Sequence, residues 1–441
     1  MPLMPSFRTR FSQLPHSVRL LAFPLTLLAI EFLDELVYGA GQAAWPVIRD
    51  DLGLSYIQIG ALLSLPGVVG SLIEPFIGIA GDIIRPGGSS PRRYLILFGG
   101  VAFTLALLLA AVSQGFFSLM FAFMLFFPAS GAFVSLSQAA LMDTDPTRHE
   151  QNMARWTFAG SLGVVAGPLI LIVALVLGPG WRGLYLAFAI SAVILVIIAR
   201  RFPLIPGASS IIDPESTQDS RFDKSQEPQA QYIGDVPVVQ DFKSGVLNAL
   251  HALRNKEILR WLVLLEFSDL MLDVLYGFLA LYFVDVVGIT PAQAALAVSV
   301  WLVVGLVGDF LLIPLLERVS GLVYLRFSVI LELILFPVFL LVPNMWGKLV
   351  LLGLLGLFNA GWYAVLKGRL YTAMPGQSGT VMAVGTVAGL VGSIIPLILG
   401  LVAQRYNIEV AMWILLTGPI ALLIGIPWQK RGKNMESSSP V

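Results

Sequence analysis

The sequence predicts an all-α polytopic membrane protein with twelve transmembrane helices in two homologous six-helix halves. Three observations predict this fold class. Hydrophobic residues make up 57% of the chain and charged residues only 12%, whereas a soluble domain has about 25% charged residues. The apolar residues fall into twelve stretches, each close to the roughly 20 residues that a helix needs to cross about 30 Å of hydrocarbon. The polar positions of the first six stretches recur in the second six.

The twelve spans follow from apolar runs that short polar segments separate. Glycine and proline inside them, such as Gly67 and Pro168, are compatible with helix because neighbouring helices satisfy the freed backbone groups. We place the spans near 20–45, 54–82, 94–113, 116–142, 155–178, 182–202, 258–284, 291–316, 322–343, 346–371, 379–403 and 409–428.

The internal repeat is clearest at the acidic positions. The pattern Glu-Phe-x-Asp at residues 31–34 reappears 235 residues later at residues 266–269. At the same offset Glu74 corresponds to Asp309 and Asp82 to Glu317, and at an offset of 229 Gly163 corresponds to Gly392. The repeat predicts that the two halves arose by duplication and place equivalent side chains at equivalent depths.

The repeat and the polar segment between its copies define the domain organisation. Residues 1–202 form the first six-helix half, and residues 258–441 form the second half with a short cytoplasmic tail. Residues 203–257 form a cytoplasmic linker, because the part rich in Pro, Ser, Gln, Asp and Glu is too polar to bury a core of its own. The linker is a tether or a regulatory segment.

The basic residues predict the orientation. Of the 27 Lys and Arg residues, four lie on the side opposite the N-terminus, namely Arg49, Arg182, Lys348 and Arg405. Loops that are rich in Lys and Arg stay in the cytoplasm. We therefore expect a multi-pass protein of the cell membrane with both termini in the cytoplasm.

Several function classes find no support in the residues. The chain has no cysteine, which excludes disulfides and cysteine-based metal or redox chemistry. It has no His-Glu-x-x-His zinc motif and no Walker-type Gly-x-x-x-x-Gly-Lys. We expect no enzymatic activity, no cofactor, no bound metal and no nucleic-acid partner.

A loop motif carries a resemblance to a known family. The segment after the second span reads Gly-Ile-Ala-Gly-Asp-Ile-Ile-Arg-Pro-Gly over residues 78–87, and basic residues follow at Arg92 and Arg93. Its duplicate after the eighth span reads Pro-Leu-Leu-Glu-Arg-Val-Ser-Gly over residues 314–321. Over essentially its whole length the chain resembles a major facilitator superfamily transporter, although no basic residue directly follows Asp82.

The resemblance implies a cytoplasmic gate. In such a gate the acidic residue of the loop pairs with basic residues and with a helix N-terminus of the other half, which carries roughly half a positive charge. The alternative is that Asp82 only caps its own loop. The expected gate residues are Glu74, Gly78, Asp82, Arg85, Asp309, Glu317 and Arg318.

Acidic residues follow one face of the first and seventh spans, near mid-membrane. An acidic side chain at the centre of a spanning helix costs roughly 2.5–3.5 kcal/mol, so these residues are expected to face an aqueous cavity, carry a proton or have a partner. Crowded carboxylates repel each other, so at least one in each group is expected to hold a proton. The coupling and substrate residues are Glu31, Asp34, Glu35, Glu266, Asp269 and Asp273.

Further polar residues are expected to complete the substrate cavity. They lie on the same faces of the first and seventh spans or on the fourth and tenth spans. They are Tyr38, Gln42, Gln138, Tyr276, Asn359, Trp362, Tyr363 and Lys367. Lys367 is also close enough to the cytoplasm to belong to a loop or gate.

These features predict a secondary active transporter that moves a small solute by alternating access, works as a monomer and is coupled to protons. The pattern Gly163-x-x-x-Gly167-Pro168 resembles part of a signature of family antiporters and favours efflux, although small residues also serve close helix packing. A proton-linked importer, a divalent-cation carrier, which would use many carboxylate oxygens, and a non-transporting receptor or scaffold remain the alternatives.

Overall fold

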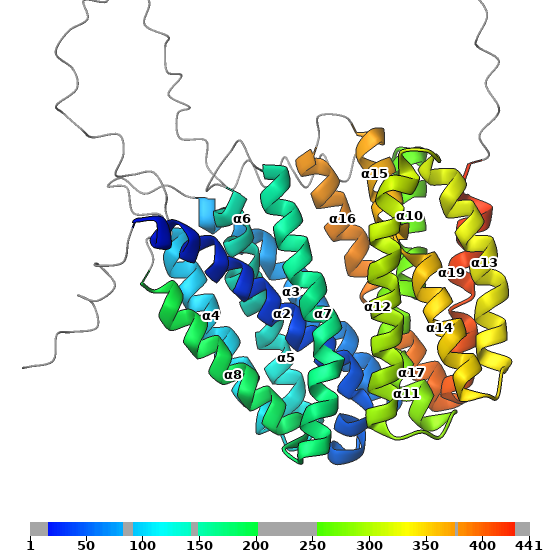
Figure 1. Cartoon of the computed structure of the whole chain (residues 1–441), viewed down its shortest axis with the longest axis horizontal. Helices are drawn as coiled ribbons and strands as arrows, with labels where there is room; N and C mark the ends of the chain where they lie inside the picture. Colours follow the sequence, from blue (N-terminus) through cyan, green and yellow to red (C-terminus); the bar gives the residue numbers. More distant parts are fainter. Residues whose placement is uncertain (1–15, 83–90, 143–148, 202–253, 375–377, 428–441) are drawn as a thin grey trace, which may run out of the picture.

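The computed structural model describes residues 16–82, 91–142, 149–201, 254–374 and 378–427 (Figure 1). Within these ranges every regular element is a helix. The expected linker lies outside the described residues, except for its last four positions.

The helices before the linker form the first half of the molecule. The segments α5, η1 and α6 follow one another without a break and make one span. The elements are α2 (His16–Leu52), α3 (Tyr56–Asp82), α4 (Pro91–Ala111), α5 (Phe116–Ser130), η1 (Gly131–Ser135), α6 (Leu136–Met142), α7 (His149–Leu177) and α8 (Gly180–Ala199).

The helices after the linker form the second half. Several spans here consist of two or three segments, because the helix changes pitch or breaks within the span. The elements are α10 (Lys256–Asp269), η3 (Leu270–Val274), α11 (Leu275–Asp285), α12 (Pro291–Leu316), α13 (Gly321–Leu341), α14 (Met345–Asn359), α15 (Trp362–Ala373), α16 (Ser378–Gly392), α17 (Ile395–Arg405), α18 (Ile408–Ile414) and α19 (Thr417–Gly425).

Joined in this way, the described elements make 12 helical stretches, and each coincides with one predicted span. Ten of the stretches are long and apolar enough to cross a membrane by length and composition. The other two are the first and the seventh, which carry the acidic residues. The chain therefore has the predicted fold of a multi-pass membrane protein.

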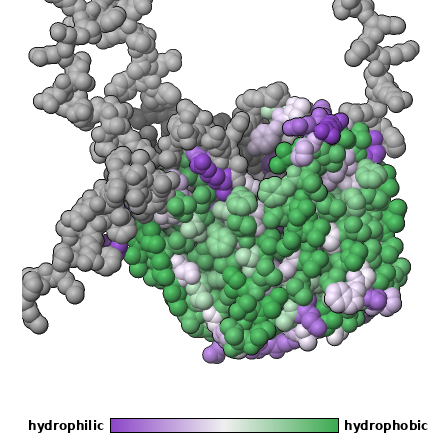
Figure 2. Space-filling model, in the orientation of Figure 1, coloured by the Kyte–Doolittle hydropathy of each residue, from purple (hydrophilic) through white to green (hydrophobic). Residues whose placement is uncertain are grey.

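The two halves stand next to each other, with α2 to α8 on the left of Figure 1 and α10 to α19 on the right. We call the side at which α2 begins and α19 ends the terminal side, and the opposite side the distal side. Apolar side chains cover most of the face that Figure 2 shows, over helices of both halves, while hydrophilic residues gather towards the two ends. This pattern is typical of a surface that lies in lipid.

Five of the described spans depart from regular α-helix within their length, the fourth and seventh at π-helical turns and the tenth to twelfth at breaks, and local sequence explains the departures in the fourth and the tenth. In the fourth span the π-helical turn η1 begins at Gly131, three residues after Pro128, which cannot donate a backbone hydrogen bond. In the tenth span the chain breaks between α14 and α15 at Gly361, whose φ of +70° favours glycine. In the seventh span η3 contains no Pro or Gly. Such distortions are frequent at functional sites.

Candidate functional site

The acidic residues of the first span face two different neighbours. The hydroxyl of Ser130, at the end of α5, donates a hydrogen bond of 2.9 Å to Asp34. Asp34 also interacts electrostatically with Glu74 of α3. Glu31 lies against α7, where a Cβ on Gly160 would come within 2.7 Å of its Oε1 atom. Glu31 and Glu35 interact with each other and with Asp34.

The two halves meet at Glu35 and Asp273, which interact electrostatically across their boundary. Two tyrosines surround this crossing. The hydroxyl of Tyr38 hydrogen bonds to Asp273, and its ring packs edge-on against Tyr276 with 5.8 Å between the ring centroids. The hydroxyl of Tyr276 donates to the carbonyl of Gly39 at 3.1 Å. Contacts of α2 with η3 and with the start of α11 thus join the halves at mid-membrane.

Acidic residues continue through the second half. Asp273 interacts with Asp269, and Asp269 with Glu266. The ammonium of Lys367, on α15, interacts with both Asp269 and Glu266 and lies 5.7 Å from the centre of the Tyr363 ring. Lys367 is therefore the basic partner of these carboxylates among the described residues.

Together these residues form one connected series that runs from the first half into the second, each interacting with the next. We call it the carboxylate row. It consists of Glu74, Asp34, Glu31, Glu35, Asp273, Asp269 and Glu266. Glu31 is buried, whereas Glu74 and Asp273 are surface-exposed residues of their helices.

Equivalent acidic residues of the two halves lie beside helix distortions in equivalent spans. In the first half Glu74 lies against the π-helical turn, where a Cβ on Gly131 would come within 2.6 Å of its Cγ atom. In the second half Asp309 accepts a hydrogen bond from the backbone of Gly361 at the start of α15. The amide of Asn359 donates 3.1 Å to the carbonyl of Met271 in η3. The distortions therefore have polar partners close to the row.

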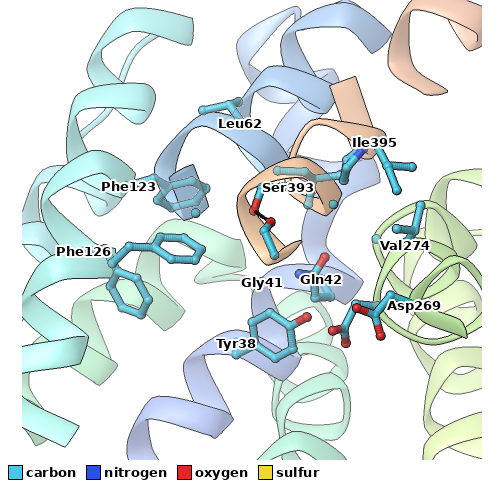
Figure 3. Close-up of a pocket in the computed structure, with 18 of the residues that line it drawn as sticks. Tyr38, Gly41, Gln42, Leu62, Phe123, Phe126, Asp269, Val274, Ser393 and Ile395 are labelled. Atoms are coloured by element: carbon cyan, nitrogen blue, oxygen red, sulfur yellow. Dashed lines mark hydrogen bonds between the residues drawn. The ribbon is translucent and has the colours of Figure 1, made fainter. Parts of the chain in front are cut away.

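A cavity of about 350 Å³ borders the row between the two halves. Figure 3 shows Phe123 and Phe126 on one side, Asp269 on the other, and Tyr38 and Gln42 between them. The first half contributes Val37, Tyr38, Gly41, Gln42, Trp45, Leu62, Leu63, Gly67, Ser71, Phe123, Phe126, Phe127 and Tyr185. The second half contributes Glu266, Asp269, Asp273, Val274, Gly277, Gly389, Gly392, Ser393, Ile395 and Pro396.

Comparison with known proteins identifies the family. The chain matches the Major Facilitator Superfamily over residues 27–395. It belongs to this superfamily. It is 22% identical over 383 residues to the fosmidomycin resistance protein of Escherichia coli (strain K12). This match covers 86% of this chain and 85% of that protein.

Solved structures agree with the superfamily fold. A variant of the nucleoside transporter NupG superposes with a TM-score of 0.71 at 13% identity, covering 92% of this chain and 98% of that one. A bacterial homologue of the human lysosomal transporter Spinster, inward-facing and occupied, gives 0.59 at 14% identity, covering 93% of each chain. At these identities the likeness concerns the fold.

Two predicted cavity residues of this protein pack inside the second half and do not line the cavity. Trp362 is fully buried and donates to Ser328 at 2.8 Å, so it packs within the second half and does not line the cavity. Asn359 is buried as well, and its amide donates a hydrogen bond to Met271 of η3. The break at Gly361 directly precedes Trp362, so Trp362 does not occupy the face that an uninterrupted helix would give it.

Three other predicted cavity residues do not line the cavity either. Gln138 contacts the sulfur of Met153 at 3.6 Å. Tyr276 is buried at the crossing of the halves. Tyr363 is exposed and interacts with Asp269. Tyr38 and Gln42 line the cavity as predicted, and so do three of the six predicted acids, all from the second half.

The predicted gate residues whose side chains the structure describes lie at two different depths. Glu74 and Asp309 lie beside helix distortions near mid-membrane. Glu317 and Arg318 are exposed at the terminal-side end of α12. Arg85 lies outside the described residues, and so do the surroundings of Gly78 and Asp82 at the end of α3.

On the distal side, residues of the two halves make direct contacts that were not predicted from the sequence. Arg49 and Tyr56 of the first half both bind the carboxylate of Asp285 in the second half. The backbone N–H of Tyr56 donates to the side chain of Gln404 at 3.0 Å. Two sequence signals for this contact were available. Asp285 lies 235 residues after Asp50, which is the offset of the internal repeat, and Arg49 is one of the four basic residues expected on that side.

Close packing of α3 against α17 extends these contacts towards the cavity. The hydroxyl of Ser64 accepts a hydrogen bond of 2.9 Å from the N–H of Leu397. A Cβ on Gly60 would come within 2.6 Å of the carbonyl oxygen of Pro396, and one on Gly400 would lie 3.1 Å from the Cα of Gly60. We call the contacts of Arg49, Tyr56, Ser64, Asp285, Leu397 and Gln404 the distal closure.

The aromatic wall of the cavity and the partner of Asp34 were not predicted from the sequence. Phe123, Phe126 and Phe127 stand in a phenylalanine-rich part of the fourth span, which was the available signal. Ser130 follows the same segment. Among the described residues, no group of three or more His, Cys, Asp or Glu side chains is placed to hold a metal ion.

Proposed function

We propose that this protein is a proton-coupled secondary transporter that exchanges protons for a small solute by alternating access. In this proposal the terminal side faces the cytoplasm, as the distribution of basic residues indicates. The protein acts as a monomer in the cell membrane and exports its solute.

The carboxylate row is the observation that supports proton coupling. Seven carboxylates interact in series across the boundary of the halves, and Lys367 is the basic residue beside them. The excess negative charge is unfavourable where lipid and protein exclude water. Protons can neutralise it, and so can a positively charged group of the solute. Once the solute's positive group neutralises the carboxylates, they bind protons less strongly, and the reverse also holds. This competition favours exchange of solute for protons over their joint transport.

The distal closure supports alternating access. It joins α2, α3, α11 and α17 through polar contacts that a rocking motion of one half against the other can break and remake. In the proposed cycle the structure is the state closed towards the outside. The central site lies near the midplane, between the halves, as in transporters built from structural repeats.

The glycines of α7 do not decide the direction of transport. A Cβ on Gly163 would come within 2.6 Å of the carbonyl oxygen of Phe32, and one on Gly167 would overlap the backbone of α2 at Ala40. Backbone contact of α2 with α7 requires these small residues. The proposed export of the solute therefore rests on the competition between solute and protons for the carboxylate row.

Proton movement caused by solute tests the proposal. Purified protein is reconstituted into liposomes that contain the pH-sensitive dye pyranine. Three solutes are added in turn, namely 1-methyl-4-phenylpyridinium, uridine and fosmidomycin. We expect at least one of them to enter while protons leave the vesicles. Joint entry of solute and protons would indicate an importer, and dependence on Ca²⁺ or Mg²⁺ would indicate a divalent-cation carrier. Absence of flux for every solute and cation would favour a receptor or scaffold.

A further inference from the structure

The cavity has two chemically different walls. Its first-half wall is aromatic, with Phe123, Phe126 and Phe127 from α5. Trp45 extends this wall, since its ring lies 6.1 Å from that of Phe123. Ring faces of this kind bind flat apolar groups and also attract cations.

The wall of the second half is acidic. Glu266, Asp269 and Asp273 line it, and Asp269 interacts with both of the others. Asp273 has free surface and lines the cavity. A carboxylate or phosphonate solute would place its charge against these groups. A neutral polyol would leave the aromatic wall without an apolar partner.

The polar residues between the walls are positioned by their neighbours. The indole N–H of Trp45 donates to the side-chain oxygen of Gln42 at 3.1 Å. Gln42 in turn hydrogen bonds to Tyr38, and the hydroxyl of Tyr38 hydrogen bonds to Asp273. This chain of contacts links the aromatic wall to the acidic wall and fixes the orientation of the Asp273 carboxylate.

We propose that the solute is an organic monocation with a flat, apolar body. Its positive nitrogen lies between Asp269 and Asp273, and its rings lie against Phe123 and Phe126. A volume of about 350 Å³ is at the lower end of the range for sites of drug-sized ligands. The inference rests on the proposed function, because it names the solute of the same site.

Three compounds of the same two-ring shape test the charge. They are 1-methyl-4-phenylpyridinium, a permanent cation; 4-phenylpyridine, which is neutral at pH 7.5; and biphenyl-4-carboxylate, an anion. Binding to the purified protein is measured by calorimetry at pH 7.5. We expect the cation to bind, the neutral compound to bind about tenfold more weakly, as for one lost charge-assisted contact of about 1.4 kcal/mol, and the anion not to bind.

Variants of each wall separate its contribution. Asp269→Asn keeps the side-chain shape and is expected to abolish the preference for the cation over the neutral compound. Phe126→Ala is expected to weaken the binding of both compounds equally, and Phe126→Leu to weaken it less. Phe117→Ala is the matched control, because Phe117 belongs to the same helix and is 84% exposed; it should bind as the unaltered protein does.

Tighter binding of the anion, or an unchanged cation preference in Asp269→Asn, would overturn this inference. The outcome is independent of proton coupling. If uridine or fosmidomycin drives proton movement while the cation does not bind, the proposed function stands and the solute class is wrong. If the cation binds and is transported without proton movement, the solute class stands and the proposed coupling is wrong.

Discussion

Arg49 at the end of α2 and Asp285 at the end of α11 form an ion pair that joins the two halves on the distal side. Tyr56 binds the same carboxylate. Asp285 thus receives two partners from the first half, and its removal should weaken the closure more than the loss of a pair within one half.

The first prediction is that Asp285→Asn opens the distal side more often. An exposed ion pair contributes up to about 1 kcal/mol, which corresponds to a change of about fivefold. The chain has no cysteine, so a cysteine placed at Leu63 in the cavity can report access. Its labelling by a membrane-impermeant thiol reagent, added from the distal side, should become about fivefold faster.

Asp50→Asn is the matched control for this prediction. Asp50 also pairs with Arg49, at 2.8 Å, but it belongs to the same helix and does not join the halves. Its labelling rate should stay close to that of the unaltered protein. Equal acceleration in both variants would show that Arg49 acts within the first half alone.

The second prediction separates two carboxylates of the row by their position. Asp269 lines the cavity, whereas Asp34 is hydrogen-bonded to Ser130 and does not. Asp269→Asn should therefore weaken the binding of 1-methyl-4-phenylpyridinium about tenfold, because a lost contact of about 1.4 kcal/mol corresponds to a factor of ten. Asp34→Asn removes no contact with the solute and should change its binding by less than about twofold. Calorimetry with both purified variants measures this. Equal weakening would mean that the row acts on the solute as a whole.

The third prediction concerns Gly392, where an added Cβ would overlap the carboxylate of Glu266. Because this carboxylate ends a flexible side chain, Gly392→Ala should move Glu266 and leave the fold intact. Solute binding should fall, while thermal unfolding stays unchanged. Gly389→Ala is the control, since Gly389 lines the same cavity and an added Cβ there meets open space. Similar binding in both variants would exclude a role for the position of Glu266.

The fourth prediction concerns stability at the break in the tenth span. Gly361 has a φ of +70°, and a Cβ there would overlap Leu312. A left-handed residue other than glycine costs about 1–2 kcal/mol, and overpacking adds about 1–3 kcal/mol. Gly361→Ala should therefore lower the melting temperature of the purified protein by several degrees.

Gly368→Ala provides the comparison in α15. An added Cβ meets open space there, and replacing an exposed helical glycine by alanine stabilises by up to about 1 kcal/mol. Its melting temperature should stay the same or rise. If the Gly361→Ala protein has the same melting temperature as the Gly368→Ala protein, the break tolerates ordinary backbone geometry.

The sequence predicted the twelve helical stretches because apolar runs of this length have few other stable arrangements in a membrane. The repeat also predicted equivalent positions, and Glu74 and Asp309 do occupy equivalent places beside helix distortions. Their position beside these distortions was not predicted, since a carboxylate next to a helix distortion has the same sequence signal as one in a gate.

The cavity lining was predicted only in part, because helical periodicity assumes a regular helix. The π-helical turn η3 and the break at Gly361 change the faces that residues after them present. Trp362, which a regular helix would have directed to the cavity, is buried for this reason. Contacts between spans, such as that of Ser130 with Asp34, depend on tertiary packing that the sequence alone does not specify.

Proton-driven accumulation, compared with solute exchange, tests the central role of the carboxylate row most directly. The solute that moves protons in liposomes is radiolabelled, and its accumulation along a pH gradient is measured beside its exchange for unlabelled solute without a gradient. Asp34→Asn and Glu35→Gln alter the row outside the cavity lining. We predict that both variants lose accumulation and keep exchange. Accumulation at the unaltered rate in both variants would contradict the account.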